Sequence, residues 1–137
     1  MDNTHSNTRF ICGEIVFYLH LLVFLFWIIP FFVPAAIWAD RVTVHFFYIV
    51  TLVSIEIVSG ILMYPVTGSF DLICPITILM QCIRGYRWHE PAAYRHSFVV
   101  EILERLQVRF QKKTITVLII VSILMVMCQY FLGFPFV

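Results

Sequence analysis

The stretch that decides the fold is residues 11–33, ICGEIVFYLHLLVFLFWIIPFFV, where Glu14 and His20 are the only Asp, Glu, His, Lys or Arg residues. At about 1.5 Å per residue, a helix of this length reaches roughly 30 Å, the thickness of the hydrocarbon core of a bilayer. The stretch closes with Pro30, Pro34 and Trp38, and such residues end helices and mark membrane interfaces. We interpret the stretch as a first membrane helix, because it is too long for a cleaved signal peptide.

Composition agrees with this interpretation. The chain has 137 residues, of which 61% are apolar and 12% are charged, whereas a soluble domain is nearer one half apolar and one quarter charged. A soluble domain of this size cannot bury so many large apolar side chains. The formal net charge of +1 gives no attraction to nucleic acid. We therefore expect an all-α integral membrane protein that forms a single domain, residues 1–137, in contact with the lipid bilayer and not with nucleic acid.

Two further stretches are long and apolar enough to cross. Residues 43–65 contain only His45 and Glu56 as ionisable interruptions, and residues 114–136 carry no charge. Between them, residues 72–83 are apolar but too short to cross as a helix, which is typical of re-entrant or half-spanning segments. The expected architecture is three transmembrane helices plus this short segment. A tilted fourth span is the alternative.

The polar part of the chain is the connection before the last span. Its residues 97–113 place apolar side chains at helical spacing, and Glu101 can pair with Arg105 four residues on. We expect an amphipathic helix with Ser97 as N-cap, lying either in the headgroup plane or against its own protein. Seven of the nine basic residues lie in this connection: Arg84, Arg87, Arg95, Arg105, Arg109, Lys112 and Lys113. The positive-inside rule therefore places it in the cytoplasm, with the N-terminus inside unless the short segment crosses.

Ionisable groups inside a span are rare and need partners. Because the first two spans are antiparallel neighbours, His20 and Glu56 are predicted to lie at a similar depth near the midplane and to pair. His45 is expected at the opposite membrane border. Glu14 is expected to bind Thr77 or a free backbone N–H of the short segment.

The order of these residues resembles a family of small bacterial membrane proteins of unknown function, marked by a Cys-Pro-Leu-Thr motif. The resemblance rests on Glu14 and His20, then His45 and Glu56, then residues 74–77, Cys-Pro-Ile-Thr, and covers about residues 14–104. Ile76 replaces the Leu of the motif, and Met80 stands about where the family has Glu. The resemblance implies a multi-pass protein of the bacterial inner membrane and names no activity.

Three functions remain open from the sequence. The first is a non-enzymatic accessory or structural membrane subunit, within a homo-oligomer or a larger membrane complex. The second is a small transport or proton-relay module, whose candidate ligand or relay residues are Glu14, His20, Glu56, Cys74 and Thr77. The third is a b-type haem protein, for which His20 and His45 lie at unsuitable depths within one chain. We expect no cofactor and no metal site, because the four cysteines form no metal-binding spacing.

Overall fold

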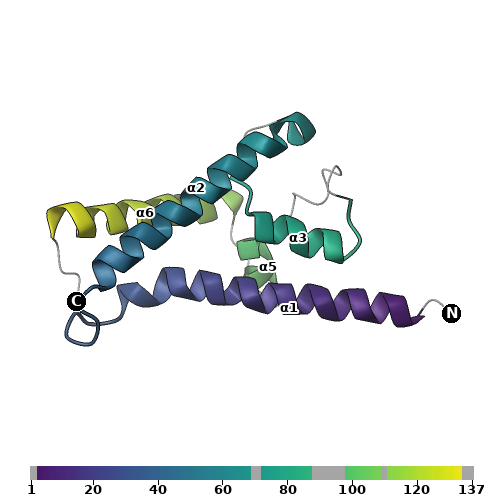
Figure 1. The fold of residues 1–137 in the computed structure, drawn as a ribbon, viewed down its shortest axis with the longest axis horizontal. Coiled ribbons are helices and arrows are strands. Elements are labelled where there is room, and N and C mark those ends of the chain that lie inside the picture. The colour runs from purple at the N-terminus through teal and green to yellow at the C-terminus, as the bar shows by residue number, and fades with distance from the viewer. Residues whose placement is uncertain (1–2, 69–71, 88–97, 109–110, 134–137) are drawn as a thin grey trace.

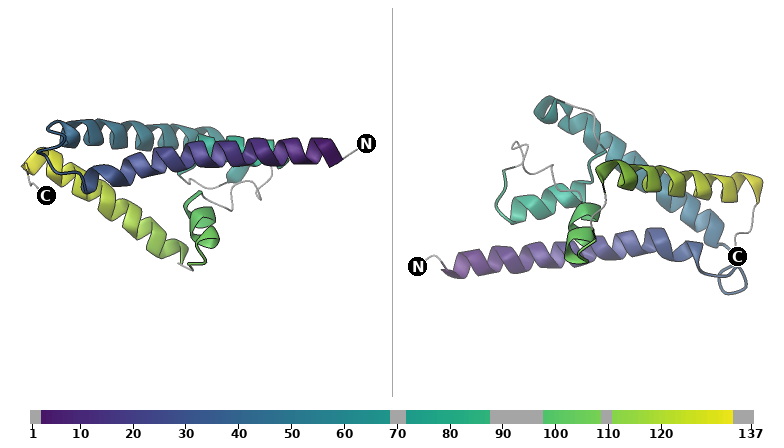
Figure 2. Two further views of the ribbon diagram at one scale, coloured as in Figure 1. Left: turned by 90° about the horizontal axis from the view of Figure 1, so that it is seen from below. Right: turned by 180° about the vertical axis from the view of Figure 1, so that it is seen from behind.

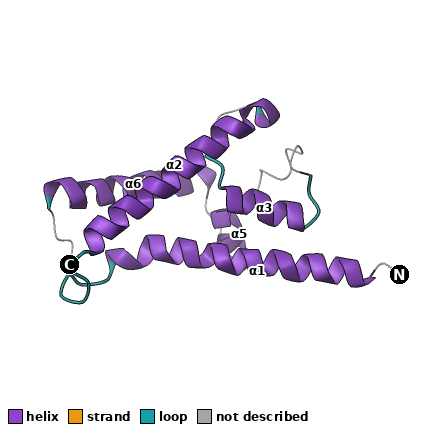
Figure 3. Cartoon of the chain, in the orientation of Figure 1, coloured by secondary structure: helices purple, strands orange, loops and turns teal. Residues whose placement is uncertain are grey.

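The computed structural model describes residues 3–68, 72–87, 98–108 and 111–133, and the elements in these ranges are helices joined by loops, without a strand (Figure 3). Three helices are long and apolar enough to span a membrane, as the sequence predicts. They are α1 (Asn3–Ile28), α2 (Arg41–Thr67) and α6 (Lys112–Leu132). Their candidate spans are Thr8–Phe31, Arg41–Thr67 and Lys113–Leu132.

The spans expose most of their apolar side chains. Few residues in each span are buried inside the chain, and Leu22, Leu62 and Phe131 are among the many large apolar residues exposed to the surroundings. So much exposed apolar surface is unfavourable in water, whereas lipid covers it without penalty. The fold is therefore that expected of a membrane protein.

The turn between the first two spans fixes how α1 and α2 begin to pack. A single 3-10 turn, η1 (Ile29–Phe31), carries Pro30 at its start and ends the first span. The Tyr48 hydroxyl donates to the Val23 carbonyl at 2.6 Å, and His45 Nε2 lies 2.8 Å from the Trp27 carbonyl oxygen. Each contact satisfies a polar side chain near a helix end. His45 lies near the start of α2, and its side chain is buried within the protein.

Beyond this turn, α2 diverges from α1 and crosses α6 (Figure 1). The rings of Phe46 and Tyr130 stack 3.9 Å apart between the two helices. Trp27 Nε1 donates to Ser122 Oγ at 3.2 Å and so ties the end of α1 to α6 as well. The three long helices are thus joined near the turn and open toward the N-terminus of α1.

Two short helices fill the open end, as the views from below and behind show (Figure 2). Helix α3 (Pro75–Ile83) begins with Pro75 in its first turn, and its nine residues reach only about 13 Å along the axis. Helix α5 (Phe98–Arg105) is shorter than the predicted helix over 97–113. It ends at Arg105 because Gln107 adopts a left-handed conformation, with φ of 57°. Ser97 lies outside the described residues.

A small apolar core holds α3 and α5 against α1. Met80 is completely buried and packs with Phe17 and Phe98, one residue from each of the three helices. Ile102, one turn after Phe98, lies on the same face of α5 and packs on the same cluster. The apolar face of α5 therefore rests on its own protein, and this packing brings the polar residues of α1, α3 and α5 together.

Candidate functional site

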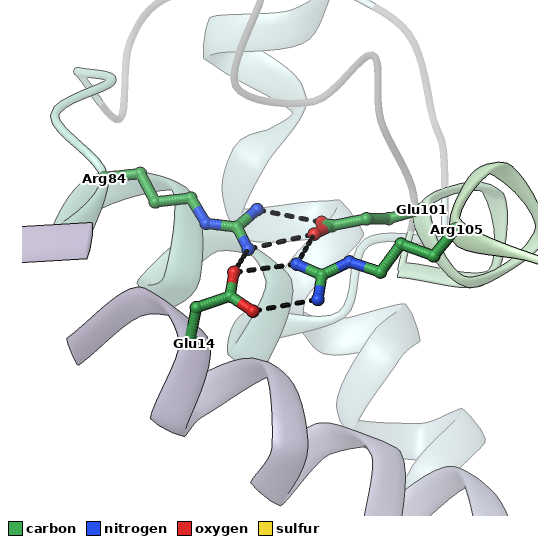
Figure 4. A network of polar contacts seen from close by, with 4 residues as sticks. All are labelled: Glu14, Arg84, Glu101 and Arg105. Carbon is green, nitrogen blue, oxygen red and sulfur yellow. Dashed lines mark hydrogen bonds and ion pairs between the residues drawn. The ribbon is translucent and has the colours of Figure 1, made fainter. Parts of the chain in front are cut away.

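Four charged side chains meet where α1, α3 and α5 converge (Figure 4). Glu14 comes from α1, Arg84 caps the end of α3, and Glu101 and Arg105 lie one turn apart on α5. Arg84 approaches α1 so closely that a Cβ at Gly13 would stand 2.9 Å from its Cγ. The glycine beside Glu14 thus leaves room for the arginine that binds the carboxylate.

In this cluster two carboxylates are held between two guanidinium groups. We call the four residues the ion-pair network. Arg105 donates to both oxygens of Glu14, at 2.8 and 2.7 Å, and to Glu101 at 2.9 Å. Arg84 donates twice to Glu101, at 2.9 Å each, and once to Glu14 at 3.0 Å. Bidentate contacts of this kind are the strong form of the arginine–carboxylate pair. The four formal charges cancel.

These contacts shift the pKa values of the three network residues on α3 and α5, namely Arg84, Glu101 and Arg105. Burial alone would raise the pKa of Glu101, but the hydrogen bonds and charges of Arg84 and Arg105 together lower it below its ordinary value. The hydrogen bond to Glu101 raises the pKa of Arg84, and the hydrogen bond to Glu14 raises the pKa of Arg105. All three groups are therefore charged at neutral pH.

Arg105 also lies over an aromatic ring of the core. Its guanidinium carbon is 3.8 Å from the ring centroid of Phe17, a cation–π contact that links the ion-pair network to the apolar cluster below it. The predicted pair between Glu101 and Arg105 is confirmed. The predicted partner of Glu14 is wrong, since two arginines bind its carboxylate and Thr77 does not. The only sign in the sequence that Arg84 and Arg105 could bind Glu14 was that both lie in the basic connection.

The predicted pair between His20 and Glu56 is also not formed. His20 is only 6% exposed, its ring stacks on Phe98 at 3.8 Å, and its Nε2 lies 3.3 Å from Cys74 Sγ. Burial raises the pKa of the Cys74 thiol, so the thiol is neutral and suited to donate to Nε2. His20 Nδ1 has no hydrogen-bond partner within the described part of the chain.

The other two predicted site residues lie nearby but in different settings. Glu56 is half-buried on α2, and its charge acts on the Cys74 thiol and contributes to raising the pKa of Cys74. Thr77 is buried on α3, one turn after Cys74. The structure thus divides the predicted set. His20 and Thr77 both contact the Cys74 thiol, and with Glu56, whose charge acts on that thiol, they form what we call the His20–Cys74 cluster, whereas Glu14 belongs to the ion-pair network.

Neither neighbourhood resembles a metal centre. In the described ranges, no three or more His, Cys, Asp and Glu side chains are arranged to hold a metal ion. No protein-family model, curated protein or solved structure matches the chain, so the chemistry of the site alone bears on its function.

Proposed function

We propose that the chain is a multi-pass membrane protein with a non-enzymatic role, an accessory or structural subunit whose polar residues fix the packing of its helices. The observation that carries the proposal is the ion-pair network. Both oxygens of Glu14 accept hydrogen bonds from guanidinium groups, and Glu101 is bound in the same way. Such carboxylates hold helices together and are poorly placed to exchange protons or to bind a passing substrate.

The setting that goes with this role is the bacterial inner membrane, as the resemblance implies. The basic connection would lie in the cytoplasm with the N-terminus on the same side, because α3 is too short to cross. A short chain whose spans expose most of their apolar surface has room for neighbours in the membrane. A larger membrane complex or a homo-oligomer would use that surface.

Co-purification tests the accessory role. The full chain, tagged and expressed in its native cells, is extracted in mild detergent and examined by mass spectrometry and by visible absorbance. We expect a larger membrane protein at a fixed ratio and no absorbance band. An unrelated tagged three-span protein serves as the control for carry-over. A pure homo-oligomer would contradict the accessory role and favour the structural one, and a Soret band would support the haem alternative.

A second candidate function is proton relay or small-ligand binding at the His20–Cys74 cluster. The observation that favours it is the Nδ1 of the buried His20, which has no partner among the described residues, while Nε2 of the same ring lies beside the Cys74 thiol, on which the charge of Glu56 acts. A buried polar atom without a partner is costly and calls for an explanation, such as a catalytic role or a bound water or ion.

Flux measurement separates this candidate from the structural role. In liposomes loaded with a pH-sensitive dye, a relay would carry protons down an imposed potential at a rate above that of empty vesicles. Glu56→Gln would abolish the excess rate. Cys82→Ser is the control and would leave the rate unchanged, because Cys82 lies about two turns beyond Cys74 along α3 and so outside the cluster. Absence of any excess flux in the wild-type protein would rule out the relay.

A further inference from the structure

An open pocket of about 700 Å³ adjoins the ion-pair network. It is lined by Arg9, Phe10, Glu14, Arg84, Tyr86, Glu101 and Arg105. Since the charges of the network cancel, Arg9 leaves this lining with a net charge of +1. Among the described residues no hydrogen bond or ion pair engages the exposed Arg9 side chain.

The pocket also offers hydrogen-bond donors that the network does not use. A guanidinium group has five N–H donors. Arg105 gives three of them to carboxylates within the described part of the chain, and its side chain is 38% exposed. Tyr86, which is 46% exposed, is also among the lining residues and carries a phenolic hydroxyl. Arginine side chains and hydroxyl groups together are suited to the oxygens of a phosphate.

The position of the pocket along α1 points to the membrane surface. Arg9 is the second residue of the candidate span Thr8–Phe31. Glu14 stands 17 residues before Phe31, about 25 Å along a helix, which is close to the thickness of the hydrocarbon core. The network therefore lies near one border of the membrane, where lipid phosphates lie. Phe10, 63% exposed beside Arg9, presents an apolar surface to the acyl chains at this level.

From this combination we infer that the pocket lined by Arg9, Tyr86 and Arg105 binds the phosphate headgroup of an anionic membrane lipid. The inference rests on the proposed membrane location and goes beyond the accessory role. Basic pockets between helices on the cytoplasmic side of a membrane bind such headgroups, because the arginines attract the phosphate while the apolar neighbours contact the chains. Arg9 is the residue on which the net attraction depends.

The test uses the full chain in nanodiscs of phosphatidylcholine, with and without phosphatidylglycerol. The thermal unfolding midpoint is followed by circular dichroism, and retained lipid is counted by native mass spectrometry. We expect phosphatidylglycerol to raise the midpoint of the wild-type protein. Arg9→Gln should remove most of that rise and lower the preference for retained phosphatidylglycerol about fivefold, which corresponds to one basic residue at a membrane surface.

Matched variants identify the source of the effect. Lys113→Gln makes the same change of charge at the start of the third span and should keep the full rise, whereas Arg9→Lys should restore most of it. If Lys113→Gln lost as much of the rise in the unfolding midpoint as Arg9→Gln, the lipid would be attracted by basic residues in general, and the proposed site would be overturned. A rise in phosphatidylcholine nanodiscs with dissolved inorganic phosphate would overturn the lipid in favour of a soluble anion.

The proposed membrane location fails separately from the lipid site. Release of the protein from native membranes by alkaline carbonate would overturn both proposals. A protein that resists carbonate but shows no dependence on phosphatidylglycerol would overturn the lipid site and leave the membrane location standing.

Discussion

Replacement of Arg84 by Gln will lower the free energy of unfolding by about 3 kcal/mol, because it leaves two carboxylates together with one guanidinium group. The side chains of Glu14, Arg84 and Glu101 are between 15 and 21% exposed, so solvent can screen the excess negative charge only in part. The measurement is unfolding of the purified chain in mixed micelles by increasing the fraction of denaturing detergent. Lys113→Gln, an exposed basic residue outside the network, is the matched control and should change stability by less than about 0.5 kcal/mol.

A double-mutant cycle shows whether the loss belongs to the network. Glu101→Gln alone leaves a surplus of positive charge, and Arg84→Gln/Glu101→Gln restores the balance between Glu14 and Arg105. The double variant should therefore be more stable than the sum of the single losses predicts, by about 1 kcal/mol or more. Additive losses would mean that Arg84 and Glu101 contribute separately and that the observed contacts carry no coupling energy.

Acid provides a second readout of the same network. The pKa of Glu101 is lower in the folded protein than its ordinary value near 4.5, so the unfolded chain binds more protons as the pH falls through this range. Its contribution to stability is fully present above the ordinary pKa and is lost as the pH falls through the lowered one. We expect a decline below about pH 5 in the wild-type protein and a shallower decline in Arg84→Gln, where the pKa of Glu101 is lowered less.

Met80→Ala is expected to have an effect of similar or larger size, a loss of about 2 to 5 kcal/mol. Met80 is 0% exposed and packs with Phe17 and Phe98, so truncation leaves a cavity where three helices meet. Met80→Leu, which nearly conserves volume, should cost less than about 1.5 kcal/mol and is the matched control. The same detergent unfolding measurement applies. Equal stabilities of the Ala and Leu variants would show that the site is not packed as the structure describes.

An acidic residue at position 80 is expected to be harmful. Met80→Glu would place a carboxylate among Phe17 and Phe98, and the ion-pair network already engages Arg84 and Arg105 in binding Glu14 and Glu101. An uncompensated buried charge costs several kcal/mol, so this variant should fail to accumulate in membranes. A stable Met80→Glu protein would indicate that Arg84 can turn away from Glu101 to bind the new carboxylate.

The sequence by itself determined the three membrane-capable helices and part of the local pairing. Length and apolar content suffice for the helices, because a helix that satisfies its own backbone hydrogen bonds is one of the few structures that can cross a bilayer. The pair between Glu101 and Arg105 was predictable for a similar reason, since residues four apart on a helix are neighbours whatever surrounds them. Both inferences depend only on properties of a single helix.

The tertiary structure alone decided which partners the ionisable residues take. The number of residues from the end of each helix gives the depth of a side chain in the membrane, and on that basis His20 and Glu56 were predicted at the same depth. The direction in which each side chain points depends instead on how the helices are rotated and how far they diverge. His20 instead contacts Cys74, 54 residues away, and Glu14 binds arginines 70 and 91 residues away. Those contacts exist because the Met80 core draws α3 and α5 onto α1. That packing joins helices that are far apart in the sequence, so no local sequence pattern predicts it.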